Sequence, residues 1–237
     1  MKSTCIRVFT ITIVLLLSTA FNRYVSGGIN YFHEVTPIAA SVNDNDLYND
    51  LHLEKAGLSK TVYLLALKGK EKLKARGDIS KNLITICDFS QSCKKKRLYV
   101  IDLANRKMLF NTLVAHGRNT GTEFARYFSN EPSSLKSSLG FFVTKKSYTG
   151  KHGLGLTLSG KEPGFNDKAE ERAIVMHGAD YADEDFVNKW GTLGRSWGCP
   201  AVSMKCSKQI INSIKDGSCL FIYFPDKNYL ATSELLK

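Results

Sequence analysis

The sequence lacks the patterns that would place it in a specialised structural class. It contains no C-x-x-C or H-x-x-x-H spacing, so a structural zinc site has little support, and no metal or cofactor is expected. It also has no internal repeat and no low-complexity tract. Its composition is ordinary for a globular protein, which argues against a disordered or collagen-like chain. The length of 237 residues suits one main domain with extensions and is ample for a sizeable core.

Acidic residues are outnumbered by basic ones. The chain carries 33 Lys and Arg against 22 Asp and Glu, which gives a formal net charge of +11. This charge favours anionic partners such as nucleic acid, membrane surfaces or acidic wall polymers, but it says nothing about the fold. An equally weighted interpretation is that the lysines are simply solvated and keep the protein soluble.

The first residues lack an apolar run long enough for a membrane span. Within Met1–Asn22, Lys2 and Arg7 form a basic start, Val8–Leu17 is largely apolar, and Ser18–Ala20 supplies small residues for cleavage. This is the pattern of a secretory signal, whereas a bilayer span needs about 20 apolar residues, so a stable anchor is the lesser alternative. We therefore expect an exported protein of the periplasm or cell envelope, which meets the membrane only through an uncleaved signal. Export removes nucleic acid as a natural partner.

Two helices are predicted before residue 80. Asn43-Asp44 could cap a short first helix that carries leucines on one side. A second helix is predicted over Lys60–Ala75, because apolar residues recur on one face and lysines, Lys70 among them, on the other. Arg76-Gly77 ends it in the manner of a glycine C-cap. We expect these helices to pack against the domain that follows.

From residue 83 onward the pattern changes to short β-rich runs. We predict strands at Leu83–Cys87, Arg97–Leu103, Met108–Ala115, Gly140–Thr144, Gly153–Leu158, Ala173–Met176 and Cys219–Phe224, with a helix at Lys205–Lys215. Many short strands with a few helices predict a mainly β fold. The expected organisation is a signal and start of linker (1–26), a linker and helical prefix (27–80), a main domain (81–225) and a C-terminal tail (226–237).

The stretch from His177 to Val202, HGADYADEDFVNKWGTLGRSWGCPAV, holds the strongest chemical signal. A histidine and a cysteine, each next to a glycine, lie 22 positions apart in it. A thiol acts as a nucleophile in its thiolate form, and histidine can take the thiol proton and return a proton to a leaving amine. Backbone N–H groups around Gly198 and Cys199 could hold the oxyanion of a tetrahedral intermediate. The pair therefore predicts acyl transfer through a thioester.

These residues also carry a resemblance to a known family. His177-Gly178, seventeen further residues and then Ser196-Trp197-Gly198-Cys199 resembles the signature of the L,D-transpeptidase (YkuD-like) family, which runs HG, a spacer, then S/T-H-G-C. The segments SSLGFFVT, GFNDKAEERAIVMHGADY and LGRSWGCPAV resemble its branch of murein L,D-transpeptidase catalytic domain proteins. The resemblance covers about residues 80–225. It departs in two places, since the family's second histidine is Trp197 here and its usual arginine is Ala201.

The resemblance implies an L,D-transpeptidase-like β-sandwich catalytic domain that acts on peptidoglycan stem peptides. Cys199 would attack the carbonyl of the third stem residue and expel the terminal D-residue, with His177 as base. The other ring nitrogen of His177 would be held by a backbone carbonyl such as that of Gly178. An amine acceptor would give a crosslink and water would give hydrolysis, and a monomer is expected. The alternative, which Trp197 and Ala201 keep open, is a weakly active or inert wall-binding module.

Several side chains near this pair are candidates for substrate contact or for orienting the site. Arg195 could replace the missing arginine and grip a substrate carboxylate, or it could pair with a nearby acidic residue. Trp197 could wall a cleft or belong to the core, and Tyr181 is a candidate cleft side chain. His116 could help to line the site or be a satisfied structural histidine. Ser196 could hydrogen-bond beneath the thiol or fix the turn, and the second role is favoured.

Cysteine usage leaves two interpretations open. Cys87 and Cys93 flank a short loop, Cys206 and Cys219 flank a predicted helix, and Cys199 stands apart. In an oxidising compartment the first two pairs could be disulfides, which would leave Cys199 as the odd thiol. With equal weight, all of them could be free cysteines that pack as small apolar residues.

Overall fold

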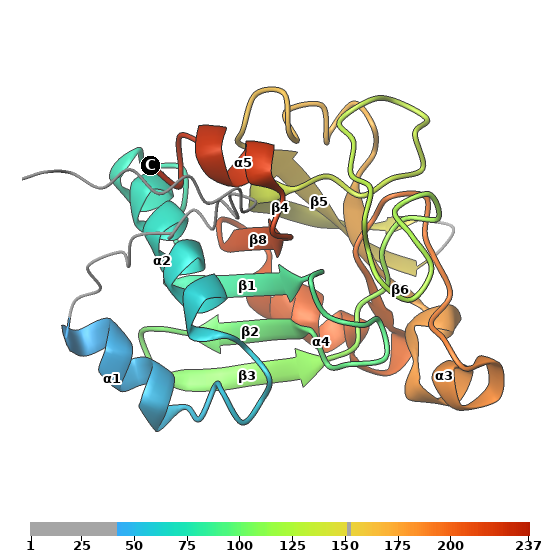
Figure 1. Ribbon diagram of the computed structural model, residues 1–237, viewed down its shortest axis with the longest axis horizontal. Coiled ribbons are helices and arrows are strands. Elements are labelled where there is room, and N and C mark those ends of the chain that lie inside the picture. Colours follow the sequence, from blue (N-terminus) through green and yellow to red (C-terminus); the bar gives the residue numbers. More distant parts are fainter. Residues whose placement is uncertain (1–41, 151–152) are drawn as a thin grey trace, which may run out of the picture. The chain divides into compact units, whose positions relative to one another are not determined.

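The computed structural model describes residues 42–150 and 153–237 (Figure 1). The predicted signal, Met1–Asn22, and the linker after it lie outside the described residues. The described strands are β1 (Leu83–Asp88), β2 (Leu98–Asp102), β3 (Lys107–Thr112), β4 (Gly140–Gly150), β5 (Gly153–Gly160), β6 (Val175–Ala179), β7 (Ala201–Ser203) and β8 (Cys219–Tyr223). The helices are α1 (Val42–Asp50), α2 (Lys60–Ala75), α3 (Glu184–Trp190), α4 (Met204–Ile214) and α5 (Lys227–Thr232). The predicted mainly β fold with a few helices is confirmed.

The strands of the described region form one sheet in the order β3-β2-β1-β8-β4-β5-β6-β7. Most neighbours are antiparallel, but the β1–β8 and β6–β7 pairs are parallel. The two ends of the sheet meet where Ala115, just after β3, exchanges hydrogen bonds of 2.8 and 3.2 Å with Ala201 in β7. The sheet therefore bends almost into a barrel, and the layers predicted as a sandwich belong to one continuous sheet.

Helix α2 has the predicted bounds because its ends are specified locally. The Ser59 hydroxyl accepts a hydrogen bond from the Val62 N–H at 3.2 Å, and Gly77 takes a left-handed φ of 74° just beyond the last turn. The helix packs on β1 and β8, as expected for the prefix. A Cβ added at Gly69 would lie 2.0 Å from the Phe141 ring, so only glycine allows this close approach between helix and sheet.

Two details of the predicted prefix are wrong. Helix α1 begins at Val42, so the predicted capping pair Asn43-Asp44 falls inside the helix. Lys70, predicted to face solvent, is only 1% exposed, and its ammonium donates to the Asn82 side chain at 2.5 Å and to Glu71 at 2.8 Å. These partners offset the cost of burying the charge.

Helix α4 supports the strand that carries His177. Its apolar face, Ile210, Ile211 and Ile214, is fully buried, and the helix contacts β5, β6 and β7. Figure 1 shows α2 in front of the sheet and α4 behind it. A Cβ added at Gly178 in β6 would lie 2.6 Å from atoms of α4, so β6 and α4 are in tight contact. Across the described residues, no helix is both long and apolar enough to cross a membrane.

The sequence did not predict α3 or α5. Helix α3 has no buried residue, so it lacks an apolar stripe that would reveal it. Helix α5 lies in the segment expected to be a tail, yet Tyr229 and Leu235 are fully buried there. The buried carboxylate of Glu162 accepts hydrogen bonds from the Tyr229 hydroxyl, at 2.9 Å, and from the Ser233 hydroxyl. The C-terminal residues are therefore tied to the domain.

All five described cysteines are free thiols, so the possible disulfides Cys87–Cys93 and Cys206–Cys219 do not form. The thiols have other neighbours: Cys93 contacts the Thr192 hydroxyl at 3.3 Å, and Cys206 contacts the Ser203 carbonyl at 3.5 Å. Cys87 and Cys219 are fully buried strand residues, and burial raises the pKa of both thiols. The alternative of free, inert cysteines is the one observed for these residues.

Candidate active site

The turn that carries Cys199 lies between α3 and β7 and requires glycine at position 198. Gly198 has a φ of 131°, which is strained for residues with a Cβ. A Cβ added there would lie 2.8 Å from the Lys136 carbonyl oxygen and 3.1 Å from Ile174 Cδ1. The chain therefore passes close to two other segments immediately before the cysteine.

Ser196 closes this turn through its hydroxyl. The hydroxyl donates to the Cys199 carbonyl at 2.6 Å and accepts from the Gly198 N–H at 3.1 Å. Outside the turn, the Ser137 hydroxyl donates to the Gly198 carbonyl at 3.0 Å, and the Ser196 N–H donates to the His116 carbonyl at 3.0 Å. The predicted use of the Gly198 N–H as an oxyanion donor does not fit, because Ser196 already engages that N–H.

The thiol of Cys199 is partly exposed and contacts the backbone that leads into β6. The Val175 N–H donates to Sγ at 3.4 Å, and Sγ lies 3.7 Å from the Ala173 carbonyl, to which it donates. Burial raises the pKa of this thiol, while the Val175 N–H and then the charge of Arg172 act in the opposite direction. The protonated thiol therefore needs a base before it can attack.

His177 lies on β6 with one ring nitrogen already fixed. Its Nδ1 is 2.9 Å from the Gly178 carbonyl, which can only accept, so Nδ1 carries the proton in the neutral ring. Nε2 is then the basic nitrogen. The parallel register pairs His177 with Ala201, so Cys199 lies two positions back along the adjoining segment. The contact between His177 Nδ1 and the Gly178 carbonyl is the one that the family resemblance implies.

Tyr181 is half-buried beside the same turn. The Gly194 N–H donates to the Tyr181 carbonyl at 2.8 Å, and a Cβ added at Gly194 would lie 2.4 Å from the Tyr181 Cβ. Burial, together with the charge of an ionised Cys199, raises the pKa of the Tyr181 phenol to about 12. The structure therefore brings Tyr181 close enough to the thiol for their charges to interact.

Arg195 and Trp197 are on the outside of the turn. Trp197 is 76% exposed, so the interpretation that it belongs to the core is wrong. Arg195 Nη1 lies 3.4 Å from the carbonyl oxygens of Arg118 and Gly121. Within the described part of the chain, Arg195 forms no ion pair, including with the acidic residues that were considered as partners, Asp180, Asp183 and Glu184. Its guanidinium is free to meet a carboxylate from solvent.

His116 does not present its ring to a substrate, since it is only 1% exposed. Its Nδ1 lies 2.8 Å from Nη2 of the fully buried Arg97, and its Nε2 lies 3.2 Å from the Gly121 carbonyl. Burial, then the charge of Arg97, lowers the His116 pKa to about 4, so the ring is neutral at pH 7. The structural role fits this position, and the prediction that His116 lines the site does not.

Sequence reasoning missed Arg172. A Cβ added at Gly198 would lie 3.4 Å from Arg172 Nη2, which places the guanidinium against the cysteine turn. The residue stands just before the apolar run that ends at His177, which is a weak signal on its own. No cluster of three or more His, Cys, Asp or Glu that could hold a metal is found among residues 42–150 and 153–237.

Comparison with known proteins bears on this site. Residues 54–223 match the family described as "L,D-transpeptidase catalytic domain". No curated protein matches the sequence significantly. Among solved structures, an L,D-transpeptidase in complex with imipenem is 13% identical, with 61% of this chain and 60% of that chain covered and a TM-score of 0.37. This chain therefore spans less than two thirds of the length of that enzyme.

Two further structures are similar at the same distant level. The L,D-transpeptidase of Stackebrandtia nassauensis is 13% identical over 76% of each chain, with a TM-score of 0.35. The helical cell shape determining protein of Campylobacter jejuni is 16% identical over 68% of this chain and 56% of that one, with a TM-score of 0.42. The sequence match from Glu54 to Tyr223 spans well over half of the chain, including the turn of Cys199 and the strand of His177. On that match, this chain belongs to the L,D-transpeptidase catalytic domain family.

Proposed function

We propose that this protein is an exported cysteine acyltransferase that acts on peptidoglycan stem peptides. The observation that carries the proposal is the Cys199 thiol, partly exposed in a rigid glycine turn, together with a His177 ring whose Nδ1 is tied to a carbonyl. Family membership supports the transpeptidase type of reaction. Export rests on the signal pattern of Met1–Asn22 alone, and N-terminal sequencing of the secreted protein would test it.

In the proposed reaction His177 Nε2 takes the proton of the Cys199 thiol. The thiolate attacks the carbonyl carbon of the third stem residue, and the tetrahedral intermediate expels the amine of the terminal D-residue, which receives the proton from His177. The thioester then passes its acyl group to an amine, which forms a crosslink, or to water, which completes hydrolysis. The Cys199 N–H takes the oxyanion role, because the Gly198 N–H is held by Ser196.

The exposed rim of the turn supplies contacts for the donor peptide. Arg195 is exposed and forms no ion pair within the described residues, so it can receive a stem-peptide carboxylate in a charge-assisted hydrogen bond. Trp197 offers an exposed apolar plane beside it. Tyr181 lies on the inner side of the turn, within electrostatic reach of the thiol.

Intact-mass spectrometry tests the proposal directly. The wild type should gain one acyl group from a muropeptide donor or a carbapenem, and Cys199→Ala should gain none. His177→Gln should form the adduct about a hundredfold more slowly, a typical loss for a general base. Cys206→Ala is the matched control, since it removes another half-buried thiol and should leave acylation unchanged. An adduct that persists in Cys199→Ala contradicts the mechanism.

The second candidate function is a wall-binding module that uses the same surface without turnover. The exposed Trp197 and the raised pKa of the Cys199 thiol favour it. A wild type that binds muropeptides but takes no acyl group from either donor supports this alternative. Mass analysis of the products separates transfer from hydrolysis if turnover does occur.

A further inference from the structure

The guanidinium of Arg172 is fixed by neutral groups only. It donates to the carbonyl oxygens of Ser129 (2.7 Å) and Lys136 (2.7 Å). It also donates to the hydroxyls of Ser138 (2.5 Å) and Ser134 (3.1 Å). Its Nε is buried and has no hydrogen-bond partner among the described atoms. Neutral partners hold the group in place without cancelling its charge, so the full positive charge remains available to its surroundings.

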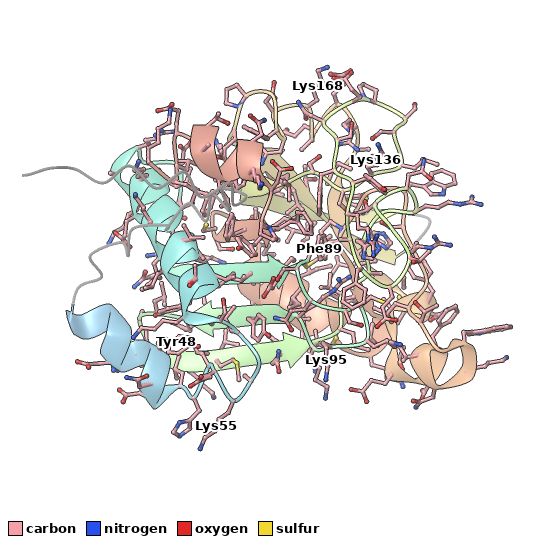
Figure 2. The ribbon with its side chains drawn as sticks, viewed as in Figure 1. Tyr48, Lys55, Phe89, Lys95, Lys136 and Lys168 are labelled. Atoms are coloured by element: carbon pink, nitrogen blue, oxygen red, sulfur yellow. The ribbon has the colours of Figure 1, made fainter. Side chains whose placement is uncertain are left out.

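That charge is not neutralised by a neighbouring carboxylate. Glu131 acts on the Arg172 charge, but its carboxylate is paired with Lys168 at 3.2 Å. Lys136 and Lys168 are both labelled in Figure 2: the Lys136 carbonyl accepts from the Arg172 guanidinium, whereas the Lys168 carbonyl, in the same segment as Arg172, accepts from the Arg172 backbone N–H. None of the direct partners of the Arg172 guanidinium is therefore an anion.

The cysteine turn lies directly against this guanidinium. A Cβ added at Gly198 would lie 3.4 Å from Arg172 Nη2, and Cys199 is the next residue. The chain that continues from Arg172 contacts the thiol itself, because Ala173 supplies a carbonyl at 3.7 Å and Val175 an N–H at 3.4 Å. Ala173 takes a left-handed φ of 52°, which turns the chain between Arg172 and the carbonyl that contacts the thiol. The same segment thus places a cation and an N–H donor next to one sulfur.

We propose that Arg172 is a positioning residue whose charge stabilises the thiolate of Cys199 and so prepares the nucleophile. The inference rests on the proposed function and adds to it a cation from outside the signature, because the usual arginine of the signature is Ala201 in this chain. Tyr181, whose charge would also interact with that of the thiolate, is neutral at pH 7, and His177 is the proposed base. Burial raises the Cys199 pKa, and the charge of Arg172 opposes that rise. The proton that leaves the thiol goes to His177 Nε2.

Alkylation of Cys199 by iodoacetamide as a function of pH tests this inference without any muropeptide. In Arg172→Gln the midpoint should rise by about one pH unit, which lowers alkylation at pH 7 about tenfold. Arg172→Lys keeps the positive charge but not the planar guanidinium, so its midpoint should rise less than that of Arg172→Gln. Arg126→Gln is the matched control, because it removes an exposed arginine and the same unit of net charge. Equal shifts in the Gln and Lys variants, or an unchanged midpoint, would overturn the inference.

The wild type contains an internal comparison that needs no substitution, which keeps the test valid if Arg172→Gln does not fold. Cys206 is also half-buried, but the charge that acts on it is the carboxylate of Asp183, whereas Arg172 acts on Cys199. Burial raises the pKa of both thiols, and Asp183 adds to that rise at Cys206 whereas Arg172 opposes it at Cys199, so the alkylation midpoint of Cys199 should lie below that of Cys206. The reverse order would mean that burial outweighs the charge of Arg172 and that the nucleophile is not prepared by it, which would overturn the inference. A protein with the expected midpoints that forms no acyl adduct would lose the proposed function and keep this inference. A wild type that forms the acyl adduct, together with an Arg172→Gln variant whose alkylation midpoint does not shift, would keep the proposed function and lose this inference.

Discussion

Replacement of Ser196 by alanine isolates the turn that presents the nucleophile. The Ser196 hydroxyl makes two hydrogen bonds, to the Cys199 carbonyl at 2.6 Å and from the Gly198 N–H at 3.1 Å. Ser196 is 4% exposed and Gly198 is buried, so water cannot readily replace the lost oxygen. Each buried group left without a partner costs about 1–3 kcal/mol. We therefore expect Ser196→Ala to lower the free energy of unfolding by about 3 kcal/mol.

The same substitution should slow the reaction of Cys199. For domains of 150–250 residues, 1 kcal/mol corresponds to about 2–4 °C in Tm, so the melting temperature should fall by roughly 6–12 °C. Without the Ser196 hydroxyl, the side-chain hydrogen bond that still holds Gly198 is the one from Ser137 to the Gly198 carbonyl. A displacement of about 1 Å in a reacting group can cost about a hundredfold in rate. Acylation of Ser196→Ala, measured well below its Tm, should therefore be about ten- to a hundredfold slower.

Thermal melts followed by circular dichroism and acylation rates from intact-mass spectrometry give the two readouts. Ser218→Ala is the control, since Ser218 is fully buried and its hydroxyl donates to the Ile214 carbonyl at 2.6 Å, away from the cysteine turn. This control should lose stability and keep its acylation rate. A Ser196→Ala protein with the wild-type Tm and rate would show that the hydroxyl bonds do not hold the turn, and the reasoning would fail.

Three further predictions follow from the buried polar groups. The pKa of His116 is about 4 in the folded protein and 6.5 in the unfolded chain, so between these pH values the unfolded chain binds a proton that the folded ring does not. The free energy of unfolding should therefore fall by about 3 kcal/mol as the pH drops through this window. His116→Gln should remove this pH-dependent loss, which chemical denaturation at pH 4 and 7 measures. Glu162→Ala leaves the Phe141 N–H and the Tyr229 and Ser233 hydroxyls without their acceptor. In this variant α5 should show faster hydrogen exchange than α2. Equal protection of the two helices would contradict the idea that Glu162 holds α5 on the domain. Denatured, unreduced protein should take a thiol-specific label at every cysteine, because the described cysteines are free. In the native protein the buried Cys87 and Cys219 should stay unlabelled. A cysteine that stays unlabelled after denaturation would argue for a disulfide.

The elements that the sequence predicted well are those specified by neighbouring residues. The bounds predicted for α2, about Lys60 to Ala75, agree with the structure, because the helical period and Gly77 specify them locally, as does the Ser59 cap that the structure adds. Seven of the eight described strands were predicted, most of them to within a few residues. β4 and β3 are the least accurate, since β4 runs on to Gly150 and β3 stops at Thr112, and the short strand β7 was not predicted. The parallel pairing of β1 with β8 joins residues more than 130 positions apart, and no local pattern encodes it.

The candidate site shows the same division between local and distant information. Cys199 and His177 could be proposed from sequence because each brings its own glycine and the spacing is a family signature. The groups that set their environment come from elsewhere: Ser137 binds the Gly198 carbonyl from 61 positions away. Arg172 is 26 positions from Gly198, and its proposed role depends on loops that contact it only in the folded chain. Electrostatics at a thiol is decided by such contacts, which sequence spacing does not report.

The two departures from the family signature have different physical consequences. Trp197 is 76% exposed, so a large side chain there disturbs no packing and can only change what meets the outer rim of the turn. Ala201 is fully buried where the two ends of the sheet meet, paired with both Ala115 and His177. An arginine in this backbone would bury its charge against neighbouring strands, at a cost that only a carboxylate partner could offset. A cation for this site must therefore come from other segments, and we propose that the two guanidiniums at the turn supply it, Arg172 for the thiolate and the exposed Arg195 for the substrate.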